Sequence, residues 1–370
     1  MRALLPSVLL SAWAVSSAGA QPASPPGQDY LVWVVSESSD LISLVRFGSG
    51  GARVEREIPT GRMPVDIDGP HGIDVSPDGQ FFYVSLGHGR PFGTLWKYRA
   101  SDGKVLGQVT LGSFPASLDV SPDGVFAYIV NFNLHGDMVP SSVSVVATEE
   151  MLEVARLTTC TMPHGSRLNP AGTRHYLACM MDDALVEIDA RAFKVIRHFI
   201  LSKGKESGAA GPPSGQAMAM EELACSPTWA QPSVDGTAVY VACNKTDEIV
   251  EVDVAGGRVA RRIPAGPGVY NLAVTSNGRL LATNKRGQSV SIFDLKSGKE
   301  LARVPTTRKI VHAAAVSPDN RYAFISAEGV GSERGTVEVI DLQTLARVAA
   351  VEVGLQAAGL DFWKMEPAAR

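Results

Sequence analysis

Three histidines occupy the same place in a repeated sequence pattern. His71, His164 and His312 each lie six residues before the proline of an expected turn, and these prolines are Pro77, Pro170 and Pro318. Imidazole is a common neutral nitrogen ligand, and three imidazoles with a carboxylate suit copper, zinc or iron. If the repeats surround one axis, their rings converge, and the pattern predicts a transition-metal site.

Other residues complete this hypothetical site. The remaining repeats place four residues at the same position: Ala116, Glu221, Tyr270 and Ala358. We assign Glu221 as a fourth metal ligand or base and Tyr270 as a neighbouring cofactor-binding residue. His88 and His135 belong to loops expected on the same face and join the candidate metal ligands, whereas His175 and His198 lie elsewhere. Alternatively, each histidine packs at a channel mouth and is satisfied by backbone or water.

Sulfur-containing residues offer a second, overlapping possibility. They cluster near His164: Cys160, Met162, Cys179, Met180, Met181, Met218 and Met220. Thioether and thiolate ligands would indicate copper, although methionine also fills gaps in cores. We favour two disulfides, Cys160–Cys179 and Cys225–Cys243, each within one repeat, although four cysteines allow three connectivities.

The elements that must position these residues are short strands joined by tight turns. Ser76-Pro77-Asp78-Gly79 stands between two apolar segments, and Ser121-Pro122-Asp123-Gly124 and Ser317-Pro318-Asp319-Asn320 repeat it. Proline and glycine set the dihedral angles of such turns. Self-similarity of roughly 40–50 residues in a β-rich chain predicts a propeller.

The chain divides into seven four-stranded blades over residues 29–370. We expect the ring to close by pairing a last strand, Ala358–Trp363, with three strands at the start. The fifth blade is expected to open with a strand over 222–227 and then a long turn over 228–232. Residues 202–216, rich in Gly, Ser, Pro and Ala, are expected to form a flexible insertion, which could act as a lid over the channel.

The N-terminus indicates export. Arg2 precedes an apolar segment that ends in an A-x-A pattern at Ala20, typical of a signal peptide over 1–20. Residues 21–28 then form a disordered leader. The net charge of −4 predicts no nucleic-acid partner, and no segment beyond the signal is long enough to span a membrane. We expect a periplasmic or secreted monomer.

Two strand pairs carry a resemblance to a known family. Tyr240-Val241-Ala242-Cys243-Asn244 with Glu248–Asp253, and Ala282-Thr283-Asn284 with Ser289–Asp294, resemble the YVTN-type β-propeller repeat. The resemblance implies an exported seven-bladed propeller that binds ligands or surfaces. More distantly, the blades look like the propellers of nitrous oxide reductase, cytochrome-type nitrite reductase and 6-phosphogluconolactonase, although no C-x-x-C-H haem attachment is present.

Three functions follow from these observations. The preferred one is an exported propeller that binds a small ligand, a metal ion or a periplasmic or extracellular partner protein on the top face of its channel. The alternative is a periplasmic copper- or iron-dependent oxidoreductase with the histidine site at the channel mouth. A weaker alternative is a lactonase-like hydrolase that uses a cation on the top face.

Overall fold

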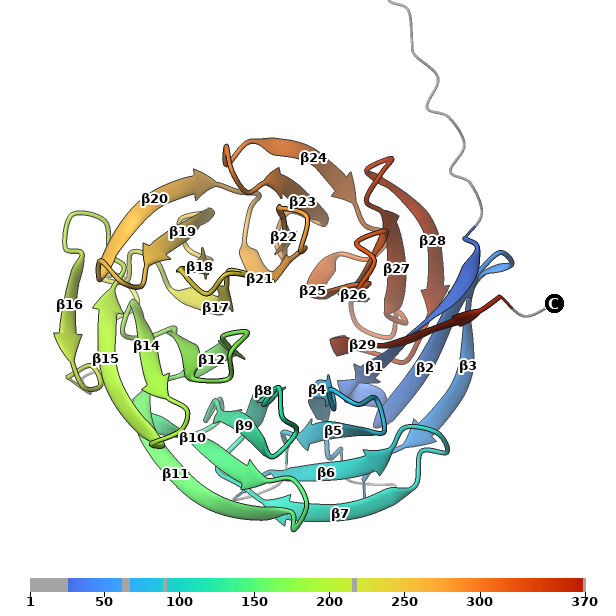
Figure 1. Cartoon of the computed structure of the whole chain (residues 1–370), viewed down its shortest axis with the longest axis horizontal. Coiled ribbons are helices and arrows are strands. Elements are labelled where there is room, and N and C mark those ends of the chain that lie inside the picture. Colours follow the sequence, from blue (N-terminus) through green and yellow to red (C-terminus); the bar gives the residue numbers. More distant parts are fainter. Residues whose placement is uncertain (1–25, 62–66, 89–91, 215–217, 369–370) are drawn as a thin grey trace, which may run out of the picture.

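The strands form a closed ring of seven antiparallel sheets, a β-propeller, as the sequence predicted (Figure 1). The computed structural model describes residues 26–61, 67–88, 92–214 and 218–368. The predicted signal peptide and most of the leader lie outside these ranges. Blades are numbered from the sheet that contains the first strand.

Each blade contributes four strands, ordered from the axis outward. Blade 1 contains β29 (Ala357–Pro367), β1 (Gln28–Ser36), β2 (Leu41–Gly48) and β3 (Gly51–Pro59), with a 3-10 helix η1 (Glu37–Ser39) between β1 and β2. Blade 2 contains β4 (Pro70–Val75), β5 (Phe81–Leu86), β6 (Thr94–Arg99) and β7 (Val105–Thr110). Blade 3 contains β8 (Pro115–Val120), β9 (Phe126–Asn131), β10 (Pro140–Ala147) and β11 (Leu152–Thr161).

The remaining blades repeat this order. Blade 4 contains β12 (Pro163–Leu168), β13 (Arg174–Cys179), β14 (Ala184–Asp189), β15 (Lys194–Ile200) and an additional β16 (Ser207–Ala210). Blade 5 contains β17 (Pro227–Pro232), β18 (Ala238–Cys243), β19 (Glu248–Asp253) and β20 (Arg258–Pro264). Blade 6 contains β21 (Val269–Val274), β22 (Arg279–Asn284), β23 (Ser289–Asp294) and β24 (Glu300–Pro305). Blade 7 contains β25 (Ile310–Val316), β26 (Tyr322–Glu328), β27 (Thr336–Asp341) and β28 (Ala346–Glu352).

The ring closes between the two ends of the chain. Strand β29 pairs antiparallel with β1, with Val34 opposite Leu360 and Gln28 opposite Pro367. The prediction of a last strand beside the first three is therefore confirmed. This pairing satisfies the backbone groups of β1 that an open sheet edge would expose.

The hydrophobic core is distributed between neighbouring blades. Trp33 of blade 1, which is fully buried, stacks on Phe82 of blade 2 with ring centroids 4.5 Å apart. Equivalent buried clusters fill the other junctions, including the one between blades 7 and 1. Because each blade packs against two others, the position of every inner strand depends on the whole ring.

Inner strands are also joined by half-buried aspartates. The carboxylate of Asp74 accepts a hydrogen bond from the backbone N–H of Val120 on the next blade, at 2.7 Å. Asp361 accepts one from Val75 in the same way at 2.9 Å. These bonds fix the relative height of neighbouring inner strands, and therefore the level at which side chains at the strand starts meet.

The insertion after blade 4 forms a strand where the sequence analysis expected a flexible loop. Strand β16 pairs with β15, and Ala209 lies opposite His198. It extends the outer edge of the blade (Figure 1), so this strand does not cover the channel. The outer edge of β15 carries unpaired backbone groups, and the small residues of the insertion can pair with them as a fifth strand.

Both expected disulfides are present. Cys225–Cys243 lies within blade 5, and Cys160–Cys179 joins β11 of blade 3 to β13 of blade 4. The expectation that each bond stays within one blade was therefore wrong for the second, because Cys160 lies at the end of an outer strand. Two disulfides are consistent with an oxidising compartment.

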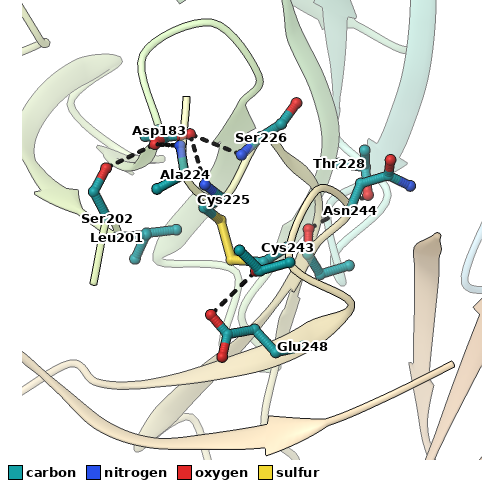
Figure 2. Close-up of a disulfide and its surroundings, with 12 residues drawn as sticks. Asp183, Leu201, Ser202, Ala224, Cys225, Ser226, Thr228, Cys243, Asn244 and Glu248 are labelled. Carbon is teal, nitrogen blue, oxygen red and sulfur yellow. Dashed lines mark hydrogen bonds between the residues drawn. A yellow bond between two sulfur atoms is a disulfide. The ribbon is translucent and has the colours of Figure 1, made fainter. Parts of the chain in front are cut away.

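Asp183 holds the segment beside the Cys225–Cys243 disulfide (Figure 2). Its fully buried carboxylate accepts hydrogen bonds from the backbone N–H groups of Ala224, Cys225 and Ser226, and from the hydroxyl of Ser202. Asp247 precedes β19 as Asp183 precedes β14, but its side chain is 40% exposed.

We expect Asp183→Ala to lower the free energy of unfolding by about 3–5 kcal/mol, because three backbone N–H groups lose their acceptor. The matched variant Asp247→Ala removes a half-exposed carboxylate that accepts from one backbone N–H, that of Gly268, and from Arg286, and it should cost about 1 kcal/mol. Urea unfolding followed by circular dichroism measures both. Equal losses in the two variants would contradict this role for Asp183.

Candidate functional site

Seven equivalent residues surround the axis where the inner strands begin. In blade order from blade 1 they are Ala358, His71, Ala116, His164, Thr228, Tyr270 and His312. The structure therefore places the three histidines of the repeat at one level of the channel. Tyr270 also lies at this level, where the sequence analysis placed it.

Glu221 is not part of this ring. It lies exposed in a turn before blade 5, and Thr228 takes the expected position. The predicted strand over 222–227 was wrong because β17 begins at Pro227. The sequence signal for the correct register was the turn Ser233-Val234-Asp235-Gly236. In it the Ser233 hydroxyl donates to the Asp235 carboxylate at 2.6 Å, as the Ser76 hydroxyl donates to Asp78 in blade 2.

Four aromatic side chains close on one another around the axis. The ring centroids of His71 and His164 are 6.3 Å apart, and those of His164 and Tyr270 are 5.2 Å apart. Tyr270 lies 5.2 Å from His312, which lies 5.4 Å from His71. We call these four residues the channel floor, because ligands approaching from the loops would meet it first.

His164 is fixed by hydrogen bonds on both ring nitrogens. Its Nδ1 lies 2.9 Å from the carbonyl oxygen of Thr228, so Nδ1–H donates. Its Nε2 then accepts from the hydroxyl of Tyr270, also at 2.9 Å. Burial lowers the pKa of His164 to about 3, so the ring is neutral at physiological pH.

His71 is oriented by a carboxylate that the sequence analysis did not identify. Glu37, in η1, accepts hydrogen bonds from His71 Nδ1 at 2.7 Å and from His88 Nε2 at 2.6 Å. Burial raises the pKa of Glu37, but the two imidazoles outweigh burial and bring it to about 2. The only sequence signal was its place directly after the first strand, in the loop that in blade 2 carries His88.

Lys285 and Glu328 lie beside the other half of the floor. The ammonium of Lys285 lies 3.5 Å from a carboxylate oxygen of Glu328 and 4.2 Å from the centroid of the Tyr270 ring. The same Glu328 oxygen is 3.9 Å from His312 Nε2. Burial strongly lowers the pKa of His312, and the charge of Lys285 lowers it further, so this imidazole is also neutral.

His135 stands at the solvent side of the group. Its exposed ring lies 5.6 Å from that of His88 and 5.5 Å from that of Phe114. Five histidines therefore gather on this face. His175 is buried against Tyr128, and His198 lies on outer strand β15, so both lie away from the site.

A small cavity continues the channel below the floor. It has a volume of about 30 Å³, and its lining includes His71, His164, His312, Trp229 and Asn271. Such a space admits one or two water molecules. A larger ligand would have to lie above the four rings, among the loops.

The described ranges contain no group of three or more His, Cys, Asp or Glu side chains arranged to hold a metal ion. The sulfur-rich alternative loses its thiolates, because all four cysteines form disulfides. Met162 and Met180 pack against Phe114 and Phe132. In these described ranges, no helix is both long enough and apolar enough to cross a membrane.

The fold and this ring define a seven-bladed β-propeller. The chain matches no known protein family and no curated protein, so the resemblance to the YVTN repeat stays a prediction. Its fold is similar to hydrazine synthase from Kuenenia stuttgartiensis, at 22% identity over 82% of this chain and 92% of that one, with a TM-score of 0.62.

Two further solved structures are similar. A functionally unknown protein from Desulfotomaculum acetoxidans has 14% identity over 90% of this chain and 98% of that one, with a TM-score of 0.67. The dihydro-heme d1 dehydrogenase NirN, in complex with DHE, has 16% identity over 90% of this chain and 74% of that one, with a TM-score of 0.60. At these identities the similarity supports the fold alone.

We expect the buried His164 to make stability depend on pH. Below its ordinary pKa of 6.5 the unfolded chain binds a proton that the folded chain excludes until about pH 3. Stability is therefore fully present above pH 6.5 and is lost as the pH falls through this window. Urea unfolding at several pH values should show a shallower dependence for His164→Gln than for His198→Gln. Identical pH profiles for the wild type and His164→Gln would refute the neutral buried state.

Proposed function

We propose that this protein is an exported binding propeller that holds a small ligand on the channel floor. The observation that carries the proposal is the closed ring formed by His71, His164, Tyr270 and His312. The similar solved structures share the fold with this chain and do not indicate its ligand. The disulfides support export to a periplasmic or extracellular location.

The partners of the floor residues suit binding. The Thr228 carbonyl fixes the orientation of His164, and the Glu37 carboxylate fixes that of His71. The protein would therefore lose little conformational freedom when a ligand binds. The rings of His71 and His312 offer nitrogen atoms to a ligand, and the ammonium of Lys285 beside them offers N–H donors. Convergent polar groups at one end of a rigid scaffold are the usual setting of a ligand site.

A metal-dependent oxidoreductase is the second candidate, and one observation favours it. An Nδ1–H bond to a carboxylate or carbonyl is how proteins orient imidazoles that bind metal through Nε2. His71 and His164 both have such a bond. A copper, zinc or iron ion would need Nε2 of His71, His164 and His312, and it would displace the Tyr270 hydroxyl from His164.

We expect native mass spectrometry of protein purified from its export compartment to show a bound small molecule. The bound mass should disappear in the double variant His164→Ala/His312→Ala and persist in His198→Ala, which changes a histidine of an outer strand. The same samples, analysed for copper, zinc and iron, separate the two candidates. A stoichiometric metal lost only in the double variant supports the oxidoreductase.

A negative result has a defined meaning. If no variant carries a bound mass, each purified protein is titrated with copper(II), zinc(II) and iron(II) and followed by thermal unfolding. Absence of a bound mass and of any metal-induced stabilisation would overturn both candidates. Loss of the bound mass in His198→Ala as well would place the ligand away from the floor.

A further inference from the structure

A second ring of seven equivalent residues lies around the floor, and its composition differs between the two sides. Six of them directly follow the second strand of their blade, and the seventh, Glu328, is the last residue of β26; in blade order they are Glu37, Gly87, Phe132, Met180, Asn244, Lys285 and Glu328. In six blades the backbone N–H of this residue donates to a carbonyl oxygen of the preceding loop. The accepting residue lies two positions before the blade's member of the first ring, the one that contains the three histidines. In blade 7, Glu328 pairs with Ile310 instead. We call these seven residues the rim.

One side of the rim is charged. Blades 6, 7 and 1 are neighbours, and they contribute Lys285, Glu328 and Glu37. The carboxylate of Glu37 is engaged by two imidazoles at 2.6–2.7 Å. Its hydrogen-bonding capacity toward a ligand is therefore largely used.

Lys285 is the rim group with capacity to spare. Its ammonium has three N–H donors. Its distance of 3.5 Å from Glu328 is much longer than the bonds of Glu37, and its other close neighbour is the side chain of Tyr270, so not all three donors are used. The side chain is 31% exposed, so a ligand can reach it. A negatively charged group of a ligand beside the ammonium would accept hydrogen bonds from its remaining donors.

The opposite side of the rim is apolar. Blades 3 and 4 contribute Phe132 and Met180, which pack with Phe114 and Met162 of the adjoining loops. Phe132 lies 4.9 Å from the His164 ring, so this apolar group reaches the floor. Met162 and Met180 are half-buried, so part of each side chain is open to a ligand.

Two of these apolar residues occupy unfavourable backbone conformations. Phe114 has a φ of 48° and Met162 a φ of 49°, whereas the equivalent loop positions before His71 and Tyr270 are Gly69 and Gly268. Glycine adopts this left-handed region without the steric cost that a side chain adds. Large apolar side chains are therefore present where the backbone alone favours glycine.

Building on the binding function above, we propose that the ligand is an amphipathic organic acid. Its acid group pairs with Lys285, and its apolar body covers Phe132, Met162 and Met180 across the floor. The cavity below the floor, at about 30 Å³, is too small for such a body, so the ligand lies above the four rings.

The first test uses 8-anilinonaphthalene-1-sulfonate, an amphipathic aromatic acid, as the probe. We expect one molecule to bind per folded chain with enhanced fluorescence. Lys285→Met should weaken binding at least about tenfold, and Lys285→Arg should restore most of it. The matched control is Lys97→Met, because Lys97 also lies over a ring, at 4.3 Å from the centroid of Phe81, but in β6, the third strand of blade 2 from the axis.

The second test addresses the apolar side. Met180→Glu should weaken binding of the sulfonate and of the uncharged dye Nile red, whereas Lys285→Met should affect only the sulfonate. Leu152→Glu places the same charge on an exposed apolar residue of the outer strand β11 and should change neither. Circular dichroism confirms that each variant is folded.

Three outcomes would overturn the inference. They are equal sulfonate affinity in the wild type and Lys285→Met, equal loss in Lys97→Met, or failure of the wild type to bind the sulfonate. None of these results removes a ligand found by native mass spectrometry, so the binding function and the organic-acid assignment fail separately. If the bound mass also depends on neither His164 nor His312, both fail together.

Discussion

Closure of the ring by β1 and β29 is the constraint on which the site depends. The two strands come from opposite ends of the chain, and their pairing in blade 1 closes the ring of seven blades. Residues separated by more than two hundred positions, such as His71 and His312, then face one another at 5.4 Å. Without closure, the same side chains would stand at the starts of separate strands.

The environment created by closure determines the chemistry of the imidazoles. A histidine in water is partly protonated near neutral pH, but His164 and His312 are buried among other rings and stay neutral. Charge is instead carried at the rim, by Glu37 and Lys285. The site thus combines two buried, neutral imidazoles with a charged border and an apolar border, which is a suitable arrangement for an amphipathic ligand.

Much of the fold was predictable because each repeat contains a turn whose residue types can be recognised in the sequence. Ser-Pro-Asp-Gly turns such as Ser76–Gly79 located the strands, and counting from them placed His71, His164 and His312 in register. The same counting failed in blade 5, where Val234 replaces the turn proline and an insertion precedes the strand. Glu221 was therefore assigned in place of Thr228. Glu37 was missed because its blade begins with the second strand of the pattern, without a turn from which to count.

The sequence by itself determined the repeat, the number of blades, the closing strand and the register of three histidines, because each depends on short-range patterns of turn and strand residues. Only the tertiary structure decided which side chains meet. The contacts of Glu37 with His71 and His88, and of Tyr270 with His164, join different blades. Such contacts arise from the packing of the whole ring, and no local sequence preference encodes them.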